Sequence, residues 1–247
     1  MMPEMLDRRI LGAVRFLDAA TMGKIGDSLL VDSPVADLRK NRSGLWVIWN
    51  VPGLEAHTAE FDQPPGTPAL GSIQFTVQVT DPAGRYLSRA ATIHVPRDPS
   101  PSNVDQAGSL FQPVDVPMYP SPSAPLSPGW AVIRAHVKDA TTGAALAGAL
   151  LRVLRTSDNQ VMARGMSDAR GEALVVIPGI PVTTFNTGNG PVLATEIDVN
   201  VEAIFDPGAG AITDPDAIEG HAGLPSISSA QKIAAGRTVA VELAVTV

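Results

Sequence analysis

Hydrophobic and polar residues alternate along several short segments of this chain, as they do in strands that bury one face. The clearest case is the segment 197–204, in which every second residue is apolar and Asp198, Asn200 and Glu202 lie between. Successive side chains of a strand point to opposite faces, so one face would lie in a core and the other in water. The same alternation predicts strands at 72–80, 91–95 and 238–245.

Shorter apolar segments predict further strands at 10–17, 28–31, 45–51, 130–138, 148–155, 160–166 and 172–177. Helical periodicity is scarce, and it predicts one short turn of helix within 226–235, which Gly236 closes. Strands separated by Gly, Pro and Asp turns, without long helices between them, favour antiparallel β-sandwiches over α/β units. The predicted fold class is therefore all-β.

Prolines divide the chain. Nine of its 22 prolines lie between Pro96 and Pro128. Proline removes a backbone donor and restricts φ, so this stretch cannot be a central strand or a helix. We therefore predict two tandem antiparallel β-sandwiches, residues 1–97 and 129–247, joined by a Pro-rich connector at 98–128 that packs on the domains. The apolar middle of the connector, 110–119, is expected to be an edge strand.

The two predicted domains open alike. Asp18 and Asp139 are each followed by Ala and, three residues on, by Thr, and a Leu pair begins at residue 29 and at residue 150. We interpret each segment as a strand, a tight turn capped by the Asp carboxylate, and a second strand. Gly23 and Gly143 are expected to adopt positive φ. An internal duplication explains the similarity, and chance convergence of turn chemistry is the alternative.

A second pair of similar segments predicts hairpin turns. These are Asp81-Pro82-Ala83-Gly84 and Asp168-Ala169-Arg170-Gly171, and each precedes a strand that ends at a proline.

The C-terminal half resembles carboxypeptidase-regulatory-like, transthyretin-like β-sandwich modules in the segments 137–143, 146–149, 167–173 and 178–179. Such modules occur in adhesins, transporters and structural appendages, so this resemblance implies a fold and not a function. The whole chain also resembles accessory proteins of contractile injection, phage-tail-like systems in the segments 40–45, 68–72 and 178–184. That resemblance implies a place in a particle, without a specific role.

Composition excludes several classes of function. Charged residues make up 17% of the chain and its net charge is −7, with no basic cluster beyond residues 37–42, so a general nucleic-acid binder is not expected. There is no Cys for disulfide or thiolate chemistry, and no apolar run of membrane-spanning length. Residues 1–9 lack the order of a signal peptide, so we expect synthesis in the cytoplasm, with an assembled or released particle as a further location.

No catalytic, cofactor or metal site is predicted. His57, His94, His136 and His221 are scattered and are expected to lie at the surface or to be lightly hydrogen-bonded. Residues 165–169 lack the closing Gly of a nucleophile elbow, and a hairpin explains them better. The acidic segment 206–219 is expected to be a solvated loop, with a calcium site as the alternative.

Trp46, Trp49 and Trp130 are expected to pack in the core, with a sugar-binding platform as the alternative. Trp46 and Trp49 are three residues apart in one predicted strand and would face opposite sides, so at most one of them could join a platform.

The resulting hypothesis is a non-enzymatic structural or assembly protein, with other protein subunits as partners and homo-oligomerisation left open. It depends on the low charge, the ordered connector and an apolar last strand that could add to a neighbour's sheet. A carbohydrate- or ligand-binding accessory module is the alternative, and a surface adhesin is a third.

Overall fold

The computed structural model describes residues 9–26, 28–59, 65–181, 195–210 and 212–247 of the chain. The chain forms two compact units, Met1–Leu17, Lys24–Val79 and Ala90–Pro117 in the first, and Asp18–Gly23, Thr80–Arg89 and Met118–Val247 in the second. The segments 1–8 and 182–184, on which the signal-peptide and tail-like interpretations partly depend, lie outside the described residues.

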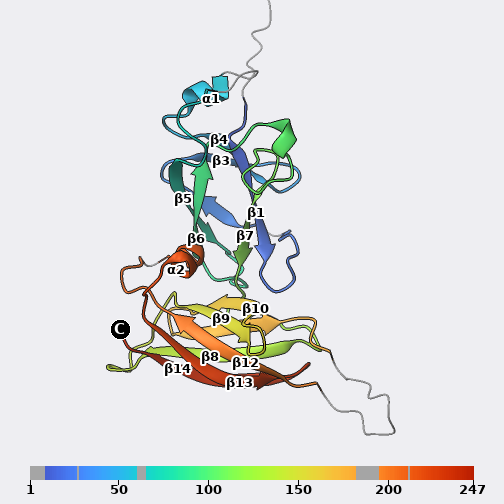
Figure 1. Cartoon of the computed structure of the whole chain (residues 1–247), viewed down its shortest axis with the longest axis vertical. Helices are drawn as coiled ribbons and strands as arrows, with labels where there is room; N and C mark the ends of the chain where they lie inside the picture. The colour runs from blue at the N-terminus through green and yellow to red at the C-terminus, as the bar shows by residue number, and fades with distance from the viewer. Residues whose placement is uncertain (1–8, 27, 60–64, 182–194, 211) are drawn as a thin grey trace, which may run out of the picture. The chain divides into compact units, whose positions relative to one another are not determined.

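The first unit contains a four-stranded sheet and a three-stranded sheet (Figure 1). The strand orders are β3(Asp37–Lys40)–β4(Trp46–Asn50)–β1(Gly12–Asp18)–β7(Val114–Met118) and β2(Leu30–Asp32)–β5(Ile73–Thr80)–β6(Arg89–Val95), with the short helices α1(Glu55–Ala59) and η1(Pro101–Asn103) outside them. Side chains from both sheets are fully buried, among them Val14, Ile48 and Val77.

The second unit is a sandwich of two sheets whose facing sides form one core. The orders are β10(Val161–Met166)–β9(Leu150–Arg155)–β12(Ile197–Ile204)–β13(Ser226–Ile233) and β11(Glu172–Ile177)–β8(Ala131–Asp139)–β14(Thr238–Val245), and α2 spans Pro215–Gly220. Ile133, Val153 and Val201 have no exposed surface in this core. The pairing is antiparallel except between β14 and β8, which run parallel in register from Thr238↔Val132 to Val245↔Asp139.

The all-β, two-sandwich fold class is confirmed, and the strongly alternating segments are the strands β5, β6, β12 and β14. The predicted helical turn within 226–235 is wrong, because residues 226–233 form β13 and pair with β12 over eight consecutive positions. Pairing with a neighbouring strand outweighs the weak local preference of a Ser- and Ala-rich segment.

The compact units do not follow the predicted boundaries at residues 97 and 129. Residues 98–117 belong to the first unit, where β7 is the edge strand beside β1, and residues 118–128 belong to the second. The turns within Asp18–Gly23 and Thr80–Arg89 also belong to the second unit. Backbone hydrogen bonds explain this: Ala19 N donates to Met118 O, and Leu87 N donates to Tyr119 O.

Arg97 binds backbone carbonyls in the first half of the Pro-rich stretch. Its guanidinium donates to three backbone carbonyls, those of Ser109 at 3.0 Å, Ala107 at 2.5 Å and Gln112 at 3.2 Å. Burial lowers the pKa of Arg97. The first half of the Pro-rich stretch is therefore held in place by satisfied carbonyl groups and is an ordered part of its unit.

The two Asp-capped turns have the same hydrogen-bond pattern. The carboxylate of Asp18 accepts from Thr21 Oγ1 at 3.0 Å, and that of Asp139 accepts from Thr142 Oγ1 at 2.6 Å. In each turn the residue before the Asp bridges to the residue six after it, Leu17 to Lys24 and Lys138 to Ala145. The duplication itself stays a prediction.

The predicted positive φ is confirmed for Gly143 and wrong for Gly23. Gly143 has φ of +72°, but in the first turn the equivalent residue is Met22, with φ of +55°, and Gly23 does not adopt positive φ. In the second pair of turns the carboxylates of Asp81 and Asp168 each accept from the backbone N–H two residues on.

Ser167 provides a test of how the two sheets of the second unit are joined. Its buried hydroxyl donates to Leu146 O at 2.6 Å and accepts from Ala149 N at 2.9 Å. We expect Ser167→Ala to lower the free energy of unfolding by about 1–3 kcal/mol, because two buried backbone groups lose their partner. Urea unfolding followed by circular dichroism measures this. The exposed Ser157→Ala is the control, and equal stability of the two variants would contradict the assignment.

Candidate binding groove

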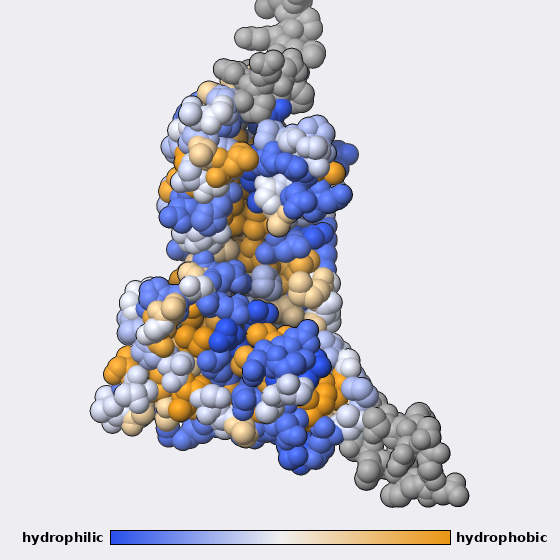
Figure 2. Space-filling view, in the orientation of Figure 1, coloured by the Kyte–Doolittle hydropathy of each residue, from blue (hydrophilic) through white to orange (hydrophobic). Residues whose placement is uncertain are grey.

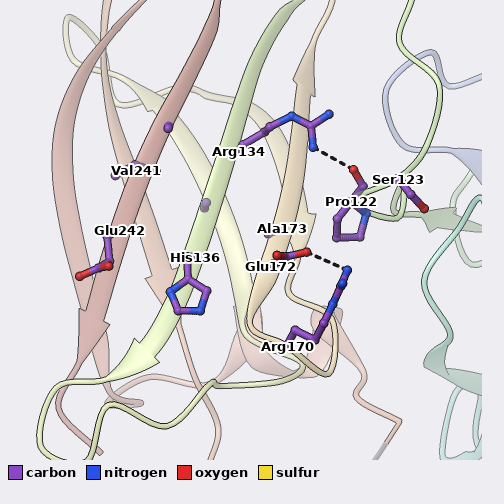
Figure 3. A pocket seen from close by; sticks show the side chains of 11 residues that line it. Pro122, Ser123, Arg134, His136, Arg170, Glu172, Ala173, Val241 and Glu242 are labelled. Atoms are coloured by element: carbon purple, nitrogen blue, oxygen red, sulfur yellow. Dashed lines mark hydrogen bonds and ion pairs between the residues drawn. The ribbon is translucent and has the colours of Figure 1, made fainter.

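An open groove of about 700 Å³ crosses the outer face of the β11–β8–β14 sheet in the second unit (Figure 3). The segment that precedes β8 forms one wall with Pro122 and Ser123. The remaining lining comes from the three strands and the turn before β11, namely Arg134, Ala135, His136, Arg170, Glu172, Ala173, Ala240, Val241 and Glu242.

The alternation of β8 creates this face. Ile133, Ala135 and Val137 point into the core, so Val132, Arg134 and His136 point the other way. Val132 packs with Leu174 and Val176, and Ala20, Ala124 and Trp130 cover this apolar end of the face. The groove is the charged, uncovered end of the same sheet face.

Strand register places a histidine between two carboxylates. His136 lies opposite Glu172 of β11 and opposite Glu242 of β14. Lys138 Nζ lies 2.5 Å from Glu242 Oε1, and this hydrogen bond, with the positive charge of Lys138, lowers the pKa of Glu242. Glu172 pairs with Arg170 at 2.7 Å. Both carboxylates are thus already neutralised by basic residues of the same unit.

Arg134 differs from the other basic residues of the groove. Its Nη1 donates to Pro122 O at 2.9 Å, and Figure 3 shows its side chain directed at that wall. Within the described part of the chain it forms no ion pair with a carboxylate, although its side chain is exposed. The groove therefore offers one cation that an acidic group could neutralise.

A network of ion pairs holds α2 against the outer face of the other sheet. Arg164 on β10 makes two hydrogen bonds of 2.9 Å to Glu219. Arg152 on β9 binds Glu202 at 2.5 Å and lies 3.6 Å from Glu219. Beneath them Ile218 of the helix packs with side chains of β9 and β12, Leu150 and Ile204.

The same helix binds a fully buried arginine. Arg89, which belongs to the second unit, lies 2.6 Å from Asp216 and 3.3 Å from Asp214, and its guanidinium lies 5.7 Å from the ring centre of Tyr119. Burial raises the pKa of Tyr119 to about 12. These charged side chains pair with one another around α2 and hold it in place, so their role is structural. We call this set the clasp: Arg89, Arg152, Arg164, Asp214, Asp216 and Glu219.

This clasp corrects the prediction of a solvated acidic loop at 206–219. Asp214 caps α2 by accepting from Asp216 N, and the carboxylates of Asp216 and Glu219 bind arginines. Asp206 accepts from Gly208 N in its own turn. Asp214 followed by Pro215 is a helix-start signal in the sequence that could have revealed α2.

The four histidines have separate environments. His57 on α1 is buried rather than at the surface, whereas His94 is exposed and its Nδ1 lies 3.2 Å from Gly71 O. His136 lines the groove and His221 ends α2. Among the described residues no group of three or more His, Asp or Glu side chains is arranged to hold a metal ion.

The tryptophans are each half-buried. The guanidinium of Arg39 lies 5.6 Å from the ring centre of Trp49, while Trp130 packs against the apolar cluster of Val132. Trp46 falls in the same alternation as the fully buried Ile48, and Trp49 falls in the opposite one. In the part of the chain that the structure covers, no helix is long and apolar enough to cross a membrane.

No protein-family model and no curated protein matches this chain. Solved structures give distant matches. The TIE protein of Bacillus anthracis is 11% identical with a TM-score of 0.30, and the match covers 96% of this chain but 34% of that one. A variant of the shaft pilin SpaA of Lactobacillus rhamnosus GG is 10% identical with a TM-score of 0.27, covering 97% of both chains.

The minor pilin GBS52 of Streptococcus agalactiae is 12% identical with a TM-score of 0.27, and the match covers 95% of this chain and 94% of that one. This chain spans about a third of the length of the TIE protein. Likenesses this distant carry no argument about function.

Glu219 makes the clasp sensitive to acid. Burial raises its pKa, but hydrogen bonds and charge from Arg164 and Arg152 outweigh burial, so its pKa lies below the ordinary 4.5. The ionised form therefore stabilises the fold above pH 4.5, and this contribution is lost as the pH falls through the lowered pKa.

We expect Glu219→Gln to destabilise the chain by about 1–2 kcal/mol at pH 7, a value reduced because the side chain is 26% exposed. The difference from the wild type should shrink as the pH is lowered below 4.5. Urea unfolding at pH 7, 5 and 3.5 would measure it, with Glu196→Gln, 44% exposed, as the control. A difference that does not change with pH would contradict this role.

Proposed function

We propose that this chain is a non-enzymatic structural protein that acts by binding other proteins, and that the groove on the β11–β8–β14 sheet is one of its contact surfaces. The observation that carries the proposal is Arg134, an exposed guanidinium in an open groove whose neighbouring carboxylates already pair with Lys138 and Arg170. An open surface that mixes polar and apolar groups is typical of protein contacts, whereas small-molecule sites are usually enclosed.

The groove favours an extended partner segment that carries an acidic side chain. The floor between the charged side chains includes the small residue Ala240 and the strand segments at Ala135 and Ala173, whose own side chains point into the core. Figure 2 shows hydrophobic and hydrophilic residues interspersed on the visible face of the second unit. An Arg in such a setting makes short, charge-assisted hydrogen bonds to a carboxylate.

We further propose, on the sequence resemblance alone, that the partners are subunits of a contractile, tail-like particle and that the second unit is a carboxypeptidase-regulatory-like module. In this view the chain is made in the cytoplasm and joins the particle there. Purified particles that contain the chain together with sheath and tube subunits would support this, and particles that lack the chain would refute it.

Charge reversal at Arg134 tests the groove. The full-length chain, tagged and expressed in the cells that encode it, is purified with its bound proteins, and these are quantified by mass spectrometry. We expect Arg134→Glu to reduce the specific partners by about tenfold or more, the typical loss when a charged contact is removed. The exposed Arg42→Glu should retain them, and circular dichroism verifies folding of both variants. Equal recovery with both variants would refute the groove as a contact surface.

A further inference from the structure

Among the described residues, β13 is the edge strand that is least protected against pairing with a strand of another chain. β13 ends the β10–β9–β12–β13 sheet and pairs with β12 over eight positions without a bulge. By contrast, the edge strand β10 has an extra residue at Met162, the pairing of β3 with β4 shifts register, β7 contains Pro117, and β2 has three residues. Bulges, prolines and short length are the devices by which proteins prevent edge-to-edge pairing.

The remaining edge strands are covered in a different way. In β6 and β11 most residues are buried. In β14 the core-facing side chains Val241, Leu243 and Val245 are at most 9% exposed, and Val239 is half-buried. On β13, Ile227 has the same alternation as the fully buried Ile233, yet it is 38% exposed. The core-facing side of β13 is therefore incompletely covered, and an added strand would bury it.

The sequence of β13 is compatible with its own copy in antiparallel pairing. A twofold axis through Ser229 places Ser226 opposite Lys232 of the second copy and Ser228 opposite Ala230, so no like charges meet. Lys232, the single charged residue of β13, is neutralised by Asp198 at 3.0 Å on β12. This register uses residues 226–232 and leaves out Ile233, which is buried at the turn toward β14.

We propose that two copies of this chain associate through antiparallel pairing of their β13 edges about a twofold axis at Ser229, which joins two four-stranded sheets into one. The interface is isologous, so each contact occurs twice. The proposal deepens and rests on the proposed function, protein binding, by naming one partner, a second copy. It does not involve Arg134 or the groove.

Two double variants that differ at one position test the register. In Ser228→Lys/Ala230→Lys, cations face each other across the axis at both 228–230 pairs. In Ser228→Lys/Ala230→Glu, each of these pairs becomes attractive. Within the chain Ser228 lies opposite Glu202 and Ala230 lies opposite Asn200, so both variants are compatible with the β12 pairing. Circular dichroism and thermal unfolding verify that both fold.

Sedimentation equilibrium of the purified full-length chain, from about 5 µM to about 1 mM, measures association. We expect a wild-type dissociation constant on the order of 100 µM, as suits a small interface. The first double variant should dimerise about tenfold more weakly or not at all, and the second at least as tightly as the wild type. A wild type that is monomeric throughout, or equal dissociation constants for the two variants, would overturn the proposal.

Arg134→Glu separates this inference from the proposed function. It should dimerise like the wild type, and a loss of dimer in this variant would overturn the β13 interface. If the wild type is monomeric but Arg134→Glu still loses its co-purified proteins, the β13 proposal fails and the groove remains. If dimerisation follows the β13 variants but the Arg134 variant keeps its partners, the groove fails and the β13 interface remains.

Discussion

Strand β8 determines both the groove and one side of the core of the second unit, because it lies between β11 and β14 and has two different faces. One face contributes Ile133 and Val137 to the core, and the other contributes Arg134 and His136 to the groove. A slip of one residue against either neighbour would bury these cationic and polar groups and expose the core residues. Burying an unpaired charge costs several kcal/mol, so the register is strongly determined.

The sequence predicts this alternation well where both faces are distinct. In β12 and β14 the apolar residues recur at every second position, and the structure has strands there. It also predicts the Asp-capped turns, because an Asp carboxylate bonds to backbone groups two or three residues away. The edge strand β13 is harder to predict. β13 lies half in water, so its core-facing positions include Ser229 and Gln231, and the alternation disappears.

The groove could not be predicted, because its residues become neighbours only through strand pairing. Glu172, His136 and Glu242 are far apart in the sequence and lie in one row across three strands. The parallel pairing of β14 with β8 is a long-range property that no local pattern encodes. For the same reason the sequence predicts a solvated loop at 206–219, because its arginine partners, Arg89 and Arg164, come from distant strands.

Most basic residues of this chain are arginines, and many of them form hydrogen bonds or ion pairs within the chain. The chain has 18 basic residues, of which four are Lys, so 14 are Arg. Many of these arginines hold loops and helices in place, as Arg97 does with three carbonyls and Arg164 with a bidentate carboxylate. Arginine suits this purpose because its planar donors bind several acceptors at once. Of the two arginines that line the groove, Arg170 pairs with carboxylates, whereas Arg134 has no carboxylate partner among the described residues, and an acidic side chain of a binding partner could supply one.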